Sequence, residues 1–183
     1  MKKPYELGII VGRFQVFHTG HEQLINKAIE LCDTVGVFIG SSQESGTIKN
    51  PFSYKTRKKI LKKVFGDDII IYPLPDIGIG NVSKWGEYVY KNVVKYFSRP
   101  PELLISGKEE KRLNWFDSVI GLSVAELYIP KIIDISATEM RKHFLENEID
   151  EWKKYTNPKL WDYYRDLQKI IIDSQNNTET ESM

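Results

Sequence analysis

Two histidines three residues apart, His18 and His21, are the side chains of this chain best spaced to act on one ligand. They close the segment GRFQVFHTGH, which also contains Arg13. If a helix begins near Thr19, the two imidazoles lie along one face and can donate to a single oxyanion. A lone histidine at a helix start is usually a surface or packing residue. Together with the guanidinium of Arg13, however, the pair predicts a site for a phosphate.

The segments around this motif have the order that phosphate sites use. Residues 7–11 (LGIIV) have the composition of a strand buried on both faces, and Gly12 marks the turn that follows. Apolar residues then recur at helical spacing over residues 24–31, which places Gly20 and His21 in the first turn of a helix. A helix start exposes free backbone N–H groups and carries a partial positive charge. The strand, the turn and the helix can therefore hold a phosphate or pyrophosphate.

A second candidate anion site begins at residues 135–141, ISATEMR. Ser136 is followed three residues later by Glu139, which is the pattern of a helix capping box and by itself would explain the segment. The hydroxyl groups of Ser136 and Thr138, the free N–H groups and Arg141 could also bind a second phosphate group.

Strand-like and helix-like segments alternate along the chain. This order predicts an α/β fold, namely a Rossmann-like, doubly wound parallel sheet of about five strands with helices on both faces and a C-terminal helical extension. The loops after the strands open on the edge where such sheets bind ligands, which gathers both motifs into one cleft. A further helix is expected between the fourth and fifth strands. The expected strands are residues 7–12, 34–40, 69–72, 103–106 and 125–129, and the expected helices are 19–31, 54–65, 85–97, one opened by 135–141, and 158–173.

The length of 183 residues fits a single domain. We expect it to cover residues 1–173, with a core at 5–147 and C-terminal helices at 148–173, followed by a disordered tail at 174–183 (SQNNTETESM). The aromatic final helix could pack on the sheet or bury an interface with a second copy of the chain.

The composition gives no reason to expect binding to nucleic acid or to a membrane. The net charge is +1, and helical spacing spreads Arg57 and the lysines of residues 55–63 around the polar side of their helix. Cys32 is the only cysteine, which excludes an intramolecular disulfide and a cysteine-built zinc site. No apolar run has the length of a membrane span, and the N-terminus does not resemble a signal peptide. We therefore expect a cytoplasmic protein.

The two motifs resemble the signatures of a known superfamily. GRFQVFHTGH is similar to the first signature of the nucleotidylyltransferases that share an HxGH motif, and GRFQ is most similar to nicotinamide mononucleotide adenylyltransferases of archaeal type. ISATEMR resembles their second signature, ISxTxxR, and follows the first by roughly 120 residues. That family usually has proline where this chain has Val16, a difference expected to alter loop stiffness rather than chemistry.

The resemblance implies transfer of the adenylyl group of ATP to nicotinamide or nicotinate mononucleotide, with Mg²⁺ accompanying ATP. It assigns catalysis to Arg13, His18, His21 and Arg141. It assigns ATP binding to these four and to Gly12, Phe14, Gly107, Ser136 and Thr138. It assigns mononucleotide binding to Ser42, Lys49, Asn50, Asp76, Asn81 and Trp85.

The chemistry of the mononucleotide suits three of these side chains. Its nicotinamide ring is flat and positively charged, so the face of Trp85 offers stacking and cation–π attraction. Asp76 and Asn81 can hydrogen-bond a carboxamide. Trp85 could equally anchor its own helix in the core, and Asp76 and Asn81 could simply be turn residues. Lys49 stands where the family often has arginine, so a bidentate grip on phosphate is not available there.

The motifs contain cations, hydroxyls and N–H groups but no paired carboxylates and no nucleophile with an adjacent base. This set suits adenylyl transfer, because a mononucleotide phosphate is largely ionised at neutral pH and needs no general base. We expect magnesium to be held mainly by ATP phosphates and water, without a protein-built metal site. The same chemistry with phosphopantetheine, flavin mononucleotide, or a phosphorylated alcohol such as glycerol phosphate with CTP stays open, as does a nucleotide sensor without catalysis. A fragment of an aminoacyl-tRNA synthetase is disfavoured, because no lysine-rich companion loop is present.

Overall fold

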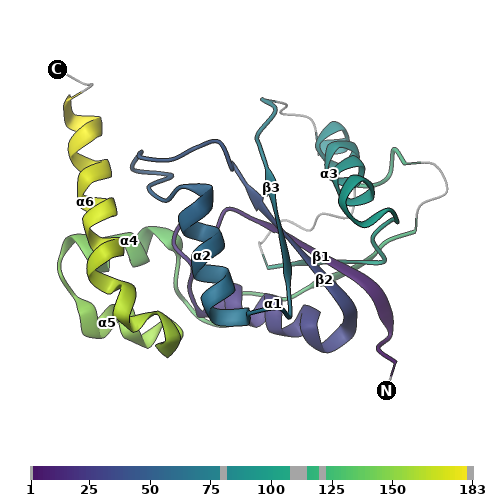
Figure 1. The fold of residues 1–183 in the computed structure, drawn as a ribbon, viewed down its shortest axis with the longest axis horizontal. Coiled ribbons are helices and arrows are strands. Elements are labelled where there is room, and N and C mark those ends of the chain that lie inside the picture. The colour runs from purple at the N-terminus through teal and green to yellow at the C-terminus, as the bar shows by residue number, and fades with distance from the viewer. Residues whose placement is uncertain (1, 79–81, 108–114, 120–122, 181–183) are drawn as a thin grey trace.

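The computed structural model describes residues 2–78, 82–107, 115–119 and 123–180. Its centre is a parallel sheet in the order β3-β2-β1-β4-β5 (Figure 1). The order reverses between β1 and β4, and the adjacent carboxyl ends of these two strands form the crevice where doubly wound sheets bind ligands. The predicted α/β fold class is therefore confirmed. The strands are β1 (Tyr5–Gly12), β2 (Cys32–Gly40), β3 (Ile70–Leu74), β4 (Leu103–Ser106) and β5 (Ala125–Tyr128).

Helices cover both faces of the sheet, because neighbouring residues of each strand point to opposite sides. In β1, Ile9 packs into a hydrophobic cluster with α3, whereas Ile10 packs into a second cluster with α1, α2 and the C-terminal helices. Figure 1 shows α2 and α3 on opposite sides of the strands. The helices are α1 (Thr19–Leu31), α2 (Tyr54–Phe65), α3 (Val82–Phe97), α4 (Ala137–Leu145), α5 (Ile149–Lys154), the 3₁₀ helix η1 (Pro158–Tyr163) and α6 (Tyr164–Thr180).

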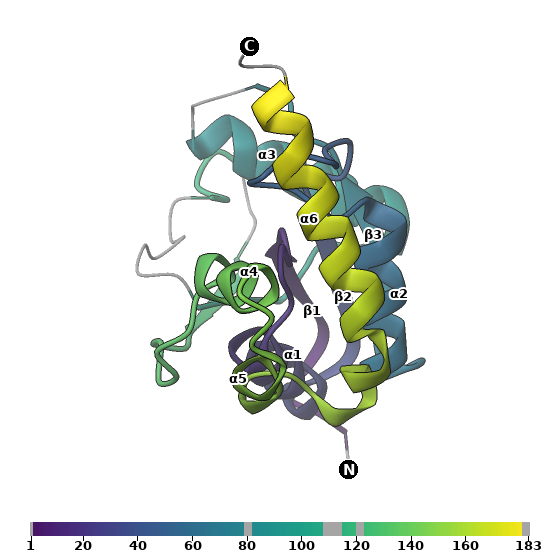
Figure 2. The same ribbon diagram turned by 90° about the vertical axis from the view of Figure 1, so that its left-hand side faces the viewer.

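The C-terminal helices pack against one another around three aromatic side chains. Phe144, Trp152 and Tyr164 are fully buried, with the rings of Phe144 and Tyr164 stacked 5.1 Å apart. Figure 2 shows α6 along one side of the molecule, with α4 and α5 beside it. The final helix therefore packs on other helices of its own chain, and its Leu167 and Ile171 belong to the same hydrophobic cluster as Ile10 of β1.

Two details differ from the sequence prediction. The short helix α5 falls within the predicted C-terminal helices of residues 148–173 but was not predicted as a separate element, and α6 continues to Thr180 although the expected helix ends at residue 173. Residues 174–180 of the expected disordered tail are thus helical, and Ser174 is buried with its hydroxyl donating to the carbonyl of Ile170. Most of the segment expected to hold a helix between β4 and β5 lies outside the described residues, and residues 115–119 form turns.

One side chain lies elsewhere than expected. Arg57 is not on the solvated face of α2 but is fully buried. Cys32 begins β2, where burial raises the pKa of its thiol to about 11 and keeps it unreactive. None of the described helices is long and apolar enough to cross a membrane.

Candidate active site

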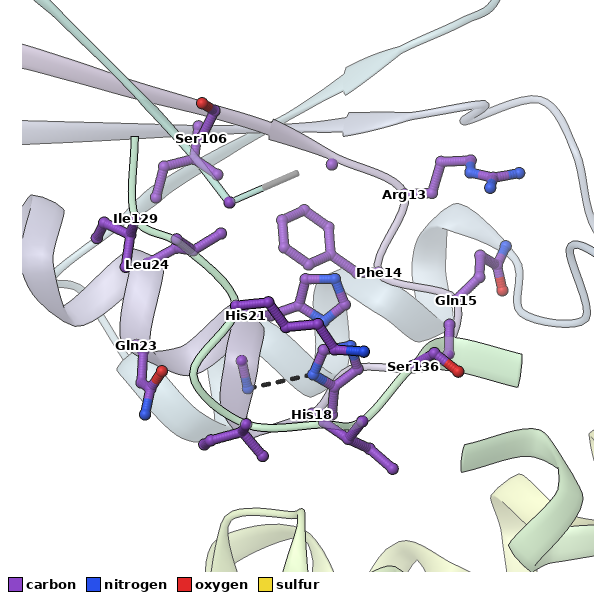
Figure 3. A pocket seen from close by; sticks show the side chains of 18 of the residues that line it. Arg13, Phe14, Gln15, His18, His21, Gln23, Leu24, Ser106, Ile129 and Ser136 are labelled. Atoms are coloured by element: carbon purple, nitrogen blue, oxygen red, sulfur yellow. Dashed lines mark hydrogen bonds between the residues drawn. The ribbon is translucent and has the colours of Figure 1, made fainter. Parts of the chain in front are cut away.

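A cavity of about 760 Å³ opens where β1 and β4 end. Its walls come from the loop after β1, the first turn of α1, the end of β4, and the segment from β5 into α4 (Figure 3). The structure thus brings the two sequence motifs together although they are far apart in the chain. Ten of the predicted site residues line the cavity: Gly12, Arg13, Phe14, His18, His21, Lys49, Gly107, Ser136, Thr138 and Arg141.

The two histidines of the first motif lie against each other at the start of α1. His18 is the N-cap residue, and its Nδ1 accepts a hydrogen bond of 3.1 Å from the backbone N–H of Gly20 (Figure 3). The ring centroids of His18 and His21 are 3.9 Å apart. The buried ring of Phe14 packs on the other side of His21, at 5.0 Å. Both imidazoles are therefore held in place by neighbouring groups before any ligand binds.

The position directly before His21 must be small, and Gly20 occupies it. A Cβ atom at Gly20 would lie 3.0 Å from both Nδ1 and Cε1 of His18, closer than ordinary contacts allow. The His18 ring can fold back over the helix start only because that space is empty. Sequence reasoning placed Gly20 in the first turn without finding this role.

His18 is neutral in this environment. Burial, and then the nearby charge of Lys131, lower its pKa from 6.5 to about 4, although Glu139 acts in the opposite direction. Because Nδ1 accepts the bond from Gly20, the single ring proton of the neutral form belongs on Nε2. His18 can therefore donate one hydrogen bond to a ligand without carrying a charge.

The second motif also begins a helix at the cavity. Ser136 caps α4, accepting from the N–H of Glu139 at 3.2 Å and donating its hydroxyl proton to the Glu139 carboxylate at 2.6 Å. Arg141 donates to the backbone carbonyl of Gln15 at 2.6 Å and to the hydroxyl of Thr138 at 3.1 Å. The Ser136 cap is thus confirmed, and Arg141 joins the second motif directly to the loop of the first.

The cavity is built for an anion. Its lining includes four cationic side chains, Arg13, Lys49, Lys131 and Arg141, whereas no carboxylate occurs among the described lining residues. The N-termini of α1 and α4 both reach it and add partial positive charge. Burial, and then the charge of Arg13, lower the pKa of Arg141. Lys131 was missed in the sequence, where a lone lysine in a loop carries no signal.

The predicted mononucleotide residues are more dispersed. Lys49 lines the cavity, but Ser42, Asn50, Asp76 and Trp85 are not among the lining residues, and Asn81 lies outside the described part of the chain. Trp85 is half-buried near the start of α3, where its ring meets Trp115 edge-on at 6.3 Å. Asp76 is exposed, and its backbone N–H donates to the side chain of Gln43.

The C-terminal helices brace the start of α1. The backbone N–H of Thr19 donates to the carbonyl of Tyr155 at 2.8 Å, and the amide of Asn157 donates to the carboxylate of Glu22 at 2.6 Å. These bonds fix the first turn of α1, which carries His21. The helical extension therefore supports the site as well as the core.

Within the described ranges, no three acidic, cysteine or histidine side chains are placed to hold a metal ion together. Arginine, lysine and neutral imidazole donors are also poor ligands for magnesium, which prefers oxygen. The described cavity residues therefore suit the phosphates of a nucleotide better than a bare divalent cation.

Comparison with known proteins finds similar sequences and a similar fold. At the sequence level, a nicotinamide-nucleotide adenylyltransferase of Saccharolobus solfataricus is 36% identical over 111 residues, which span 56% of this chain and 63% of that protein. One of Thermococcus onnurineus is 26% identical over 95% of this chain and 92% of its own length.

A solved structure shows the same fold. It is a bifunctional NMN adenylyltransferase/ADP ribose pyrophosphatase from Francisella tularensis, which matches 97% of this chain with a TM-score of 0.76 at 24% identity. This chain covers only 55% of that protein, just as it covers less than two thirds of the Saccharolobus relative. The model of the cytidylyltransferase-like family matches residues 9–154, and the chain belongs to that family.

Proposed function

We propose that this chain transfers the adenylyl group of ATP to nicotinamide or nicotinate mononucleotide, giving NAD or its deamido form and pyrophosphate, as a step of NAD biosynthesis. The observation that carries the proposal is the cavity at the ends of β1 and β4, where cations and two helix N-termini meet without a described carboxylate. The reaction brings two phosphate groups together, and such a cavity offsets their repulsion. The names of the Saccharolobus and Thermococcus relatives support the choice of acceptor.

The transfer needs alignment more than acid–base chemistry. An oxygen of the mononucleotide phosphate attacks the α-phosphorus of ATP, the bond from that phosphorus to the bridging oxygen breaks, and pyrophosphate leaves with the electron pair. The attacking phosphate is mostly ionised near neutral pH, since its second pKa is about 6. Holding the attacking phosphate in line with the α-phosphate of ATP, and stabilising the negative charge of the transition state, can therefore supply most of the rate acceleration.

We assign roles from the positions of the residues. His18 and His21 donate to oxygens of the α-phosphate beside the start of α1, and Arg13 and Arg141 bind the phosphates that leave. Gly12, Phe14, Gly107, Ser136 and Thr138 complete the ATP site, all of them lining the cavity. Lys49 binds the mononucleotide phosphate, while Ser42, Asn50, Asp76, Asn81 and Trp85 belong to the acceptor site.

Magnesium is expected to enter with ATP. The described cavity residues provide no carboxylate, so phosphate oxygens and water would be the main ligands of the ion. The protein side chains then act on the phosphate oxygens that the ion leaves free. The cytoplasmic location and a homo-oligomeric state stay predictions from the sequence.

A cytidylyl transfer to a different phosphorylated acceptor is the second candidate, favoured by the cytidylyltransferase-like family model. A panel assay separates the two. The protein is incubated with ATP or CTP and with nicotinamide mononucleotide, nicotinate mononucleotide, phosphopantetheine, flavin mononucleotide or glycerol phosphate, and the product is identified by mass. A dinucleotide formed only from ATP and a pyridine mononucleotide supports the proposal, whereas a product from CTP or from another acceptor would replace it.

A further inference from the structure

Arg57 is a buried cation that the proposed chemistry leaves without a role. It is the only arginine or lysine among the buried residues, and its side chain is fully enclosed within the described structure. None of the described carboxylates forms an ion pair with it. Burial, and then the charge of Arg13, lower its pKa to about 10, so it is still protonated at neutral pH. A buried charge of this kind is costly unless hydrogen bonds compensate for it.

The compensation comes from backbone carbonyl groups of two loops. One loop follows β1 and carries Arg13, and the other follows β2 and leads to Lys49. The guanidinium fork of Arg57 spans both, and its shortest bonds are short enough to be strong. Its hydrogen bonds run to the carbonyl oxygens of Gly40 (2.8 Å), Arg13 (2.9 Å), Ser41 (3.0 Å), Ser53 (3.4 Å) and Glu44 (3.5 Å).

A second buried side chain joins the same two loops. The Gln15 amide donates to the carbonyl of Phe52 at 2.8 Å and accepts from its N–H at 2.9 Å, so it pairs with this residue as a neighbouring strand would. Gln15 is 3% exposed and Phe52 is fully buried. The loop that begins the ATP site is thus fixed to the loop of Lys49 at two separate points.

We propose that Arg57 is a positioning residue, which, together with Gln15, locks the loop after β1 to the loop after β2 so that ATP and the acceptor bind cooperatively. This inference rests on the proposed function, because it assigns ATP to the first loop and the acceptor phosphate to the second. Arg57 touches neither substrate. It acts by holding the carbonyl groups of Arg13, Gly40 and Ser41 in one arrangement, so a ligand that orders one loop also orders the other.

Three variants test the inference. Arg57→Lys keeps a positive charge but removes the fork that reaches both loops. Gln15→Met removes the second connection with little change in length. Lys55→Met is the matched control, because Lys55 is an exposed cation on the same helix.

The decisive readout is the coupling between the two ligands. The dissociation constant of the mononucleotide is measured by calorimetry with and without an ATP analogue that has a methylene group between the α- and β-phosphorus and cannot release pyrophosphate. In the wild type and in Lys55→Met we expect the analogue to tighten mononucleotide binding by about fivefold or more. In Arg57→Lys and Gln15→Met, we expect the ratio of the two mononucleotide dissociation constants, without and with the analogue, to fall toward one. We also expect kcat to fall by about tenfold to a hundredfold.

A purely structural Arg57 would lower the melting temperature but leave the ratio unchanged. The inference would therefore be overturned if the analogue tightened mononucleotide binding in both variants as much as in the wild type. It would also be overturned if the analogue had no effect on mononucleotide binding in the wild type. If Arg57→Lys does not fold, Gln15→Met supplies the same test. Failure of the proposed function is distinguishable, because it appears as wild-type protein that forms no dinucleotide from ATP and a pyridine mononucleotide.

Discussion

The imidazole rings of His18 and His21 lie 3.9 Å apart between their centroids, inclined by 33°. Two imidazolium ions at that distance would repel each other strongly, and His18 avoids this by staying neutral, with its pKa lowered to about 4. Burial of the ring, and then the charge of Lys131, stabilise the neutral form. The two imidazoles can therefore both donate a hydrogen bond to one ligand while together carrying no more than one positive charge.

Removing His21 should impair the reaction more than ATP binding. His21→Ala is expected to lower kcat by about a hundredfold to a thousandfold, because a donor to the α-phosphate is most important as charge builds up in the transition state. The dissociation constant of ATP, measured by calorimetry, should change only slightly. Asn26→Ala, an exposed change on the same helix, is the control. Equal losses in kcat and in affinity would contradict the role given to His21.

Adding one methyl group at Gly20 should separate activity from stability. In Gly20→Ala the new Cβ atom would lie only 3.0 Å from the present position of the His18 ring. The ring must therefore move. We expect kcat to fall by about tenfold or more. Alanine is the better helix former, by about 1 kcal/mol, so the melting temperature should not fall much. Full activity in this variant would show that the His18 position is not critical.

The stability of the protein should depend on the protonation of His18. Its pKa is 6.5 when unperturbed and about 4 in the folded protein, so between these values the unfolded chain binds more protons. Stability therefore falls as the pH drops from 6.5 toward 4, and the His18 contribution to this loss is no more than about 3 kcal/mol.

Urea unfolding of wild type and His18→Asn across this range measures the effect. Asparagine can still cap α1 but does not titrate in this range. The variant should lose less stability on acidification than the wild type. Parallel losses in the two proteins would mean that His18 already titrates normally in the fold.

Trp85→Leu distinguishes a binding role from a packing role. If the indole stacks on the nicotinamide ring, the KM for the mononucleotide rises by about tenfold while ATP binding is unchanged. If Trp85 only packs against Trp115, the melting temperature falls and both KM values stay constant. Steady-state kinetics and a thermal melt of the same preparation provide both readings.

The sequence predicted the sheet because strand and helix periodicities are local properties. The runs that became β1 and β2 are almost wholly apolar, and Ser136 marks a helix start that the structure confirms. The short helix α5 was not predicted as a separate element of the C-terminal extension, because six residues give too little periodicity to recognise. The helix is stabilised by Trp152, whose ring packs against Phe144 of α4 and Tyr164 of α6.

Arg57 was misplaced for a different reason. It precedes Ile60, Leu61 and Val64 at the spacing of a buried helical stripe, yet its charge suggested the solvated face. Only the fold shows that backbone carbonyl groups from two loops surround that position. More of the predicted phosphate-binding residues of the two motifs line the cavity, because residues on two helices that start at the same edge of a sheet must lie close together. Residues on the long loops after β2 and β3 have no such constraint, and of the predicted residues there that the structure describes, only Lys49 lines the cavity.

The most direct test of the account measures pyrophosphate release and dinucleotide formation together, with wild type and His21→Ala given ATP, Mg²⁺ and each pyridine mononucleotide. We predict equal amounts of the two products from the wild type, dependent on the mononucleotide, and a rate lower by about a hundredfold or more in the variant. Pyrophosphate release without a mononucleotide, or equal rates in the two proteins, would contradict the assignment of this cavity as the adenylyl-transfer site.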